Sequence, residues 1–303
     1  MLKHLSRYTF ALIGLTILFS SCKKEYESIQ SVDAQKIKDY LAANNITAVE
    51  DPDKTGFYYQ IIPGTGTDTT KYKLTDSVLY NGVVKSLANG TVYLTTPTYA
   101  NLGTFVGYAT TLNVATIPAI RTVMTKMKRG DVARIFLPSY LAFGKNGSGD
   151  IPSNENIDLV ITTYLEKTQT ALDRRLILDF IKKNGLTGMQ KDSSGVYYSV
   201  SAAGTRPDST TNFSTVTAGY TLRFLDGTVN QTATDASFSL NPGAVIDGWS
   251  KTIPGRIGVG GKIRMLIPSG QGYKTTGAVN NNVVVIPPNT ILDFDVEITA
   301  RTN

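Results

Sequence analysis

The chain has 303 residues, of which 41% are apolar and 18% charged, and its formal net charge is +6. This is the balance of an ordinary globular protein with enough chain for about two domains of roughly 150 residues, which excludes a largely disordered chain and a coiled coil. The sequence has one histidine, His4, and one cysteine, Cys22. Everything after residue 22 therefore lacks a Ser-His-Asp triad, a Cys-His nucleophile, a zinc site with nitrogen or sulfur ligands and a disulfide framework.

The first 22 residues predict an export signal. Lys3 and Arg7 precede an apolar run of eleven residues, 9–19, far shorter than the ~20 residues that span a bilayer. The run leads into Leu-Phe-Ser-Ser-Cys, which resembles a bacterial lipobox, where the cysteine is lipidated and becomes the new N-terminus. We expect residues 1–22 to be a lipoprotein signal peptide with a lipidated Cys22. The mature protein would then be lipid-anchored in the bacterial cell envelope, in the outer membrane at its periplasmic or surface face. A plain signal peptide cut nearby is the alternative.

The charge pattern gives no sign of a nucleic-acid partner. Cleavage before Cys22 removes Lys3 and Arg7 and leaves a net charge of +4. The remaining basic residues are scattered in short clusters, which favours solvated faces over a phosphate-binding stripe. Asp150 and Glu155 lie in a Gly/Asn-rich loop where we expect no metal site, and no cofactor is expected.

After a polar tether, residues 23–32, the sequence contains two copies of one repeated unit. The segment 33–47 returns 140 residues later as 173–187, and Ile-Pro-Ser-Asn at 151–154 returns as Ile-Pro-Pro-Asn at 286–289. Each copy begins with an aspartate suited to an N-cap, Asp33 or Asp173, followed by the apolar spacing of a short amphipathic helix. We expect residues 33–168 to form one domain and residues 169–303 a second.

Strand patterns dominate both copies. They predict strands at residues 132–137, 159–164, 221–225, 262–267 and 291–298. The connections are too short for helical crossovers, so the strands should pair mostly antiparallel. The predicted fold class is α+β.

The second copy contains an ordered series of motifs. Tyr220 is followed by Asp-Gly at 226–227, Phe238, Val-Ile-Asp-Gly-Trp at 245–249, Tyr273 and the Ile-Pro-Pro-Asn turn before Leu-Asp-Phe-Asp at 292–295. In order and spacing, this series resembles the FKBP-type peptidyl-prolyl cis-trans isomerases over residues 190–300. The resemblance implies two tandem FKBP-like domains, each an antiparallel half-barrel wrapped on a short helix, with an extra N-terminal helix.

The resemblance also implies a peptidyl-prolyl isomerase without a cofactor, acting on proline-containing polypeptides. It assigns catalytic roles to Tyr220, Ile246 and Tyr273, with the Ile246 backbone N–H and the Tyr273 hydroxyl hydrogen-bonding substrate carbonyls. It assigns the substrate-binding bowl, floored by the only tryptophan, to Val245, Trp249, Ile286, Phe294 and Phe238.

The composition suits this chemistry. An X-Pro amide isomerises over a barrier of ~18–20 kcal/mol because rotation breaks the amide resonance. A catalyst needs an apolar seat for the proline ring and one or two hydrogen bonds to the twisted amide, and it moves no proton. A chain without usable histidine or cysteine can build such a site.

The sequence departs from the family pattern at two places. Asn230-Gln231 stand where the family usually has a Phe-Asp pair beside the bowl. In the first copy, Ile120, Phe143 and Leu159 stand at the positions of Trp249, Tyr273 and Phe294, and Tyr80 matches Tyr220. We therefore expect the first domain to be degenerate and non-catalytic, with the aromatic segment 93–109 as a flap or an interaction surface.

Two functional hypotheses follow. The first is an isomerase or prolyl-binding folding factor on an envelope membrane, with its activity in the second domain. The alternative is a non-catalytic FKBP-like lipoprotein that binds an envelope partner or polysaccharide. The clients and the oligomeric state stay open.

Overall fold

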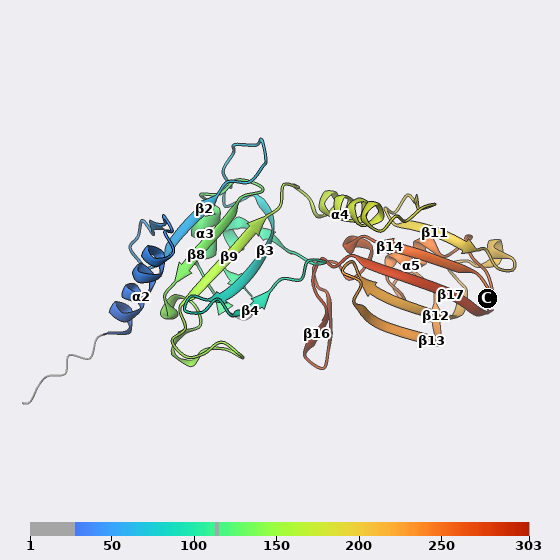
Figure 1. The fold of residues 1–303 in the computed structure, drawn as a ribbon. Coiled ribbons are helices and arrows are strands. Elements are labelled where there is room, and N and C mark those ends of the chain that lie inside the picture. The colour runs from blue at the N-terminus through green and yellow to red at the C-terminus, as the bar shows by residue number, and fades with distance from the viewer. Residues whose placement is uncertain (1–27, 113–114, 303) are drawn as a thin grey trace, which may run out of the picture.

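The computed structural model describes residues 28–112 and 115–302. The chain forms two sheet-centred bodies joined end to end, here the first and the second domain (Figure 1). All pairs of named strands are antiparallel. The expected mixed fold with few helices and antiparallel sheets is confirmed. The expected signal peptide, Cys22 and residues 23–27 of the tether lie outside the described residues.

Both domains have the same strand order. The first sheet runs Val49–Glu50 (β1), Tyr58–Ile62 (β2), Val132–Leu137 (β8), Ile157–Thr163 (β9), Ser77–Ser86 (β3) and Val92–Thr95 (β4), and Leu102–Phe105 (β5) also pairs with β3. The second runs Gln190–Lys191 (β10), Tyr197–Ala202 (β11), Lys262–Ile267 (β14), Leu292–Thr302 (β17), Thr215–Phe224 (β12) and Val229–Ser239 (β13). Two small hairpins are separate: Thr111–Leu112 (β6) with Ala115–Thr116 (β7), and Ala278–Asn280 (β15) with Val283–Ile286 (β16).

Each domain has one long and one short α-helix. The long helices are Ile29–Ala43 (α2) and Gln169–Lys183 (α4), and the short ones are Ala119–Met124 (α3) and Asp247–Thr252 (α5). Short 3₁₀ turns occupy Val106–Tyr108 (η1), Ser139–Leu141 (η2), Gly144–Asn146 (η3), Pro207–Ser209 (η4) and Ser269–Gln271 (η5).

Asp33 and Asp173 are not N-caps, so the expected helix starts are wrong. The side chains of Ser28 and Thr168 cap the two long helices, five residues before the expected caps, and residues 29–32 of the expected tether are helical. Both aspartates are buried. Asp33 accepts hydrogen bonds from the Ser139 N–H at 2.9 Å and its hydroxyl at 2.7 Å.

Asp173 does the same with Ser269, at 2.8 and 2.7 Å. Each carboxylate thus ties the long helix to the turn that follows the central strand β8 or β14. Burial raises the pKa of Asp173, and the Ser269 and Gln169 hydrogen bonds oppose that rise. The repeated aspartate therefore serves the tertiary fold rather than the helix end.

The two cores are built from the inward faces of the sheets and the short helices. In the second domain, α5 buries Trp249 and leads into Ile253 against Met265, Phe294 and Val296. The long helices cover the opposite faces through smaller clusters, such as Ile37 with Phe136 and Ile177 with Leu266. Each sheet is therefore covered on both sides over part of its area.

The sheet pairings fix which residues of the two domains correspond. Leu159 pairs with Ile135 and Val84, while Phe294 pairs with Met265 and Leu222. Leu159 thus corresponds to Phe294, as expected from the sequence, and Val84 corresponds to Leu222.

Counting two residues back along β3 and β12 places Gly82 at the position of Tyr220. Tyr80 corresponds to Ala218 instead, so the expected match of Tyr80 with Tyr220 is wrong. Both Tyr80 and Gly82 lie on the inward face, and only the sheet register separates them.

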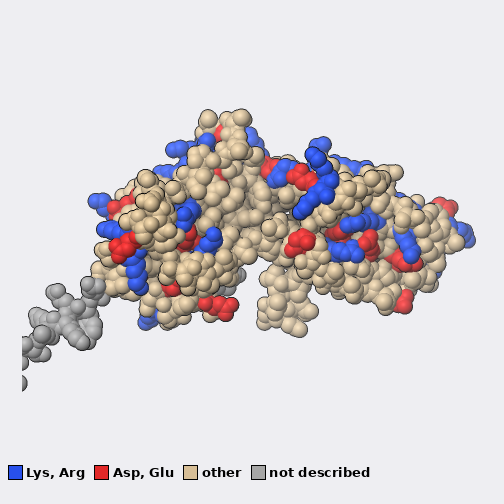
Figure 2. Space-filling view, in the orientation of Figure 1, with Lys and Arg blue, Asp and Glu red and all other residues tan. Residues whose placement is uncertain are grey.

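Charged residues of both signs are mixed over the visible face of both domains, and no single-sign stripe runs along it (Figure 2). The β15–β16 hairpin projects between the domains and carries no charged residue (Figures 1 and 2). Among the described residues, no helix is long and apolar enough to cross a membrane.

Candidate functional site

Seven of the eight predicted pocket residues line one pocket of about 470 Å³ in the second domain. This volume is in the usual range for small-molecule and peptide-side-chain sites. The seven are Tyr220, Phe238, Val245, Ile246, Trp249, Tyr273 and Phe294. The eighth, Ile286, ends β16 and is buried in the neighbouring core without lining this pocket.

Four aromatic rings form the pocket's interior around Trp249. The Trp249 ring lies 5.1 Å from Phe238, 5.4 Å from Phe294 and 5.7 Å from Tyr220, measured between centroids, with all three pairs edge-on. Tyr220 contacts all three other rings. Edge-to-face contacts are the favoured geometry for aromatic pairs, so these rings stabilise one another in fixed orientations.

The rings come from four elements, three strands and one helix. Tyr220 and Phe294 point inward from the neighbouring strands β12 and β17, and Phe238 comes from near the end of β13. Trp249 is the third residue of α5. Ile246 caps that helix: its carbonyl accepts the Trp249 N–H at 3.0 Å. The tryptophan is 3% exposed and the tyrosine is partly exposed, which suits a floor and a wall.

Tyr273 supplies a hydroxyl at the rim. It follows η5, the turn held by Asp173, and is half-buried. Burial raises the pKa of Tyr273 above its ordinary value of 10.0. Burial also raises the pKa of Tyr220, with a smaller contribution from Tyr273. Both hydroxyls therefore keep their protons, as hydrogen-bond donors must, throughout the neutral range.

Sequence reasoning missed an ion pair at the rim of this pocket. Lys274 Nζ lies 3.6 Å from Asp247 Oδ2, so the residue after Tyr273 is paired with the residue after Ile246. Both positions adjoin predicted site residues, which was the available signal. Exposed pairs of this kind contribute about 0–1 kcal/mol, so the pair orders the rim more than it stabilises the fold.

The two residues that depart from the family pattern have different surroundings. Gln231 lines the pocket. The Asn230 side chain leaves it, and its Nδ2 donates to the Val285 carbonyl of the β15–β16 hairpin at 2.8 Å. The hairpin is thereby tied to β13.

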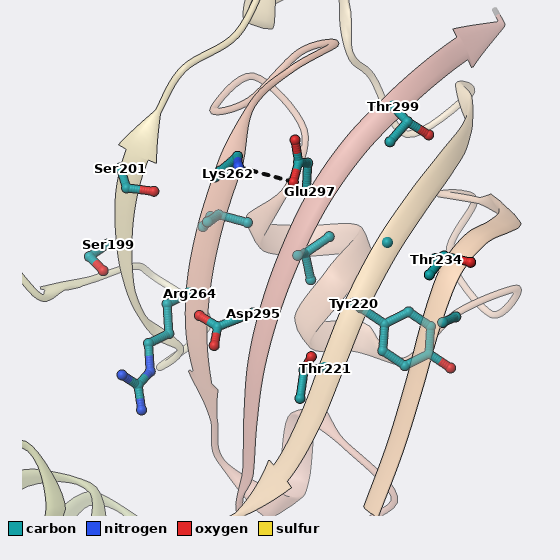
Figure 3. A pocket seen from close by; sticks show the side chains of 14 residues that line it. Ser199, Ser201, Tyr220, Thr221, Thr234, Lys262, Arg264, Asp295, Glu297 and Thr299 are labelled. Carbon is teal, nitrogen blue, oxygen red and sulfur yellow. Dashed lines mark ion pairs between the residues drawn. The ribbon is translucent and has the colours of Figure 1, made fainter. Parts of the chain in front are cut away.

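A larger pocket, of about 610 Å³, lies across the strands of the second sheet (Figure 3). Its lining combines serines, threonines and charged residues, including the Lys262–Glu297 ion pair at 3.1 Å, with a few aliphatic residues and with Tyr220, which also lines the aromatic pocket. Arg264 beside it is paired with Asp293 at 2.7 Å. Charges that are already paired and a polar lining do not suit a proline ring, so we assign the site to the smaller aromatic pocket.

No group of three or more potential metal ligands occurs within residues 28–112 and 115–302. The pocket offers aromatic surface, aliphatic side chains, phenol hydroxyls and backbone groups, with the Gln231 amide and the Asp247–Lys274 ion pair also in its lining.

The corresponding part of the first domain is built differently. Ile120 of α3 is fully buried in the core, and Leu159 is buried beside it. Gly82, at the position of Tyr220, has no side chain. A Cβ placed there would lie 2.8 Å from Leu112 Cδ1. The space that the tyrosine ring occupies in the second domain is thus filled by leucine from the β6–β7 hairpin.

Comparison with known proteins finds a family model and relatives that match part of this chain. The family model described as "FKBP-type peptidyl-prolyl cis-trans isomerase" matches residues 207–299. The FKBP-type isomerase FkpA of Buchnera aphidicola is 31% identical over 172 residues, covering 50% of this chain and 63% of the relative. FkpA of Aeromonas hydrophila is 34% identical over 119 residues, covering 37% of this chain and 40% of the relative.

Among solved structures, Escherichia coli FkpA covers 44% of this chain and 61% of its own, at 28% identity and a TM-score of 0.37. A Pseudomonas syringae peptidyl-prolyl isomerase covers 46% of this chain and 98% of its own, at 25% identity and a TM-score of 0.38.

Residues 207–299 belong to the FKBP-type peptidyl-prolyl cis-trans isomerase family, as the motif series from Tyr220 to Phe294 predicted. The chain spans between two fifths and two thirds of the length of the curated FkpA relatives it matches.

Proposed function

We propose that the second domain, residues 169–303, binds X-Pro segments of polypeptides and accelerates their cis-trans isomerisation. The observation that carries the proposal is the aromatic pocket, in which Phe238, Phe294 and Tyr220 surround the buried Trp249. A proline ring seated there loses water, and a desolvated amide rotates more easily because water no longer stabilises its planar, polar form.

The hydrogen-bonding groups act on the twisted amide and its neighbours. We assign the Tyr273 hydroxyl and the Ile246 backbone N–H as donors to substrate carbonyls, and Tyr220 as the wall that holds the ring. Because no bond is formed and no proton is moved, these groups need only favour the twisted form over the planar form. Each tenfold of rate needs about 1.4 kcal/mol, which is the strength of one well-placed hydrogen bond.

The first domain is proposed to be a degenerate, non-catalytic FKBP-like copy, and the chain a tandem of the two. Support comes from the identical strand orders and from the loss of the aromatic wall at Gly82. We further propose that the protein is held on a bacterial envelope membrane, with the outer membrane as the expected site, by lipid on Cys22. This rests on the short apolar run followed by Leu-Phe-Ser-Ser-Cys.

The test is a protease-coupled assay with a proline peptide and the full-length protein. Wild type should exceed the uncatalysed rate, and Tyr273→Phe, which removes only the hydroxyl, should lower kcat/KM about tenfold. Trp249→Leu should abolish most of the remaining activity by removing the floor. Tyr108→Ala is the matched control, since that tyrosine is 78% exposed in the first domain.

A second reading is favoured by Asn230-Gln231, which leave the pocket without the family's carboxylate. In that case the domain binds proline segments, or serves as a scaffold for an envelope partner or polysaccharide, without catalysis. Wild type would then equal the uncatalysed rate. Quenching of Trp249 fluorescence by a proline peptide would identify a binding pocket, and unchanged fluorescence would favour the scaffold function.

A further inference from the structure

The first domain contains a small pocket at the place that corresponds to the edge of the second domain's site. Its volume is about 230 Å³. Gly82 lines it at the position of Tyr220, and Leu94 lines it at the position of Gln231. The second correspondence follows from the pairing of Val84 with Leu94 and of Leu222 with Gln231. Leu102 and Leu112 complete its apolar lining.

Part of this pocket's wall belongs to the second domain. Pro287 and Pro288, from the turn between β16 and β17, line it together with the first-domain segment 94–102. The degenerate copy of a proline-binding fold thus contacts a Pro-Pro pair of its own chain.

Two specific contacts hold the domains together at this point. The Asn289 side chain donates from Nδ2 to the Asn101 carbonyl at 3.1 Å, with both residues buried at 3% and 1% exposure. The Tyr99 ring stacks on Phe224 of β12, 4.2 Å between centroids and 13° between planes. A buried hydrogen bond and a stacked ring are contacts that resist sliding, because each fails once the geometry shifts.

The clamped turn is hydrogen-bonded to the rim of the aromatic pocket. The Asn289 N–H donates to the Lys274 carbonyl at 2.8 Å, and the Gly277 N–H donates to the Tyr273 carbonyl at 3.0 Å. Tyr273 and Lys274 both line the aromatic pocket. Asn289 is therefore joined by one backbone hydrogen bond to Lys274, the residue that follows Tyr273 in the chain.

Asn289 is suited both to the backbone conformation of the turn and to the hydrogen bond between the domains. Its φ of 55° is in the left-handed region, which asparagine tolerates, and its amide supplies the donor that glycine lacks. Asn154, at the corresponding turn of the first domain, has a φ of 54° but is exposed. The same backbone geometry thus occurs twice, and only Asn289 donates a buried hydrogen bond to the other domain.

We propose that the first domain is a clamp for the second. Its segment 95–103 receives the turn 286–290, with Pro287 and Pro288 against its reduced pocket, and thereby positions the Tyr273 rim. Tyr99 and Asn289 are positioning residues, and Pro287 and Pro288 of the same chain form part of the wall of the first domain's pocket. The effect of the clamp on catalysis rests on the proposed function. The clamp itself restrains residues 273–290 whether or not the domain is catalytic.

The test uses the full chain and two matched pairs of variants. Asn289→Gly removes the interdomain donor and keeps the left-handed turn, with Asn154→Gly as its control. Tyr99→Ala removes the stacked ring, with Tyr108→Ala as its control and Tyr99→Phe as the rescue, because phenylalanine can still stack on Phe224. Readouts are amide exchange at Gly277 and Asn289, Trp249 fluorescence, and KM and kcat for a proline peptide.

Asn289→Gly and Tyr99→Ala should speed exchange at both amides about tenfold, the factor expected for one lost buried contact. They should also shift the Trp249 emission and lower kcat about threefold with KM little changed, because the Tyr273 hydroxyl favours the twisted amide, whereas the controls and Tyr99→Phe behave as wild type. Unchanged exchange and emission in both variants would overturn the clamp. Altered exchange in a protein whose wild type shows no isomerase activity would support the clamp and reject the proposed catalysis.

Discussion

At the scale of single residues, the site depends on two phenols that stay protonated. Burial raises the pKa of both Tyr273 and Tyr220 above the ordinary value of 10.0. A raised pKa means that the neutral, donating form persists as the pH rises toward 10, and nothing else that lines the pocket exchanges a proton in the proposed reaction.

We therefore expect kcat/KM to be constant within about twofold from about pH 6 to 9 and to fall only above pH 10, where Tyr273 loses its proton. Tyr273→Phe should give a lower rate that lacks the alkaline fall. Initial rates across buffers of constant ionic strength measure this. A bell-shaped profile centred near neutral pH would mean that an acid or base takes part and would contradict the mechanism.

The sequence predicted the pocket residues better than it predicted the residues that hold the surrounding elements in place. Trp249, Tyr220 and Phe294 could be chosen because they belong to the ordered motif series that resembles the FKBP family. Asp33 and Asp173 were misread as N-caps because an aspartate before apolar spacing has the same pattern whether it caps a helix or lies in its second turn. Only the tertiary structure shows Ser139 and Ser269 donating to them.

At the scale of elements, β13 borders the pocket and also supports the β15–β16 hairpin. The two non-family residues divide these tasks: Gln231 lines the pocket, and the Asn230 amide holds the Val285 carbonyl. The hairpin exposes an apolar run, with Val283 at 63% and Val284 at 57%, so its hydrogen bond to β13 restrains a segment that has little packing of its own.

Restoring the family's Phe-Asp pair at residues 230 and 231 should therefore have a different effect at each of the two positions. Gln231→Asp should raise kcat/KM by about threefold to tenfold, since an exposed position places a carboxylate beside the amide at small desolvation cost. Gln231→Asn, of the same size without charge, is the control. Adding Asn230→Phe should give no further gain, because it removes the donor to Val285.

The proline-peptide assay measures these rates, and the melting temperature of each variant shows whether it is folded. A folded Gln231→Asp protein with unchanged activity would mean that the carboxylate does not reach the amide.

Strand positions followed from the sequence where apolar residues alternate or run together between turn residues: 132–137 and 262–267 are strands with the expected bounds. The residue-by-residue correspondence between the two copies did not follow from the sequence. Tyr80 and Gly82 differ by two residues, which keeps both on the inward face, so the in-out pattern cannot distinguish them. Only the pairing of β3 with β9 shows that Gly82, and not Tyr80, corresponds to Tyr220.

At the scale of the whole molecule, the internal repeat predicted two copies but not their contact. Asn101 and Asn289 are joined across 188 positions of sequence, and neither belongs to a periodic pattern. The expectation that 93–109 forms a flap or interaction surface was nearest to this outcome: the segment contributes β5 to the sheet and Tyr99 to the domain junction. Polar residues in loops carry no sign of the partner they meet.

The membrane anchor is also a property of the whole chain, and it concerns residues outside the described part. If Cys22 carries the anchor, Cys22→Ser should release the protein from membranes, since an apolar run of eleven residues is too short to span a bilayer. Acyl chains contribute about 0.8 kcal/mol per buried CH₂, so two or more are needed for stable attachment.

Fractionation after a high-salt wash, together with incorporation of labelled fatty acid, measures this. Ser21→Ala is the matched control, because it keeps a small residue before the cysteine and should leave both lipid incorporation and membrane attachment intact. If Cys22→Ser protein still sediments with membranes, the attachment comes from an uncleaved signal or from a membrane partner, and the lipid anchor is wrong.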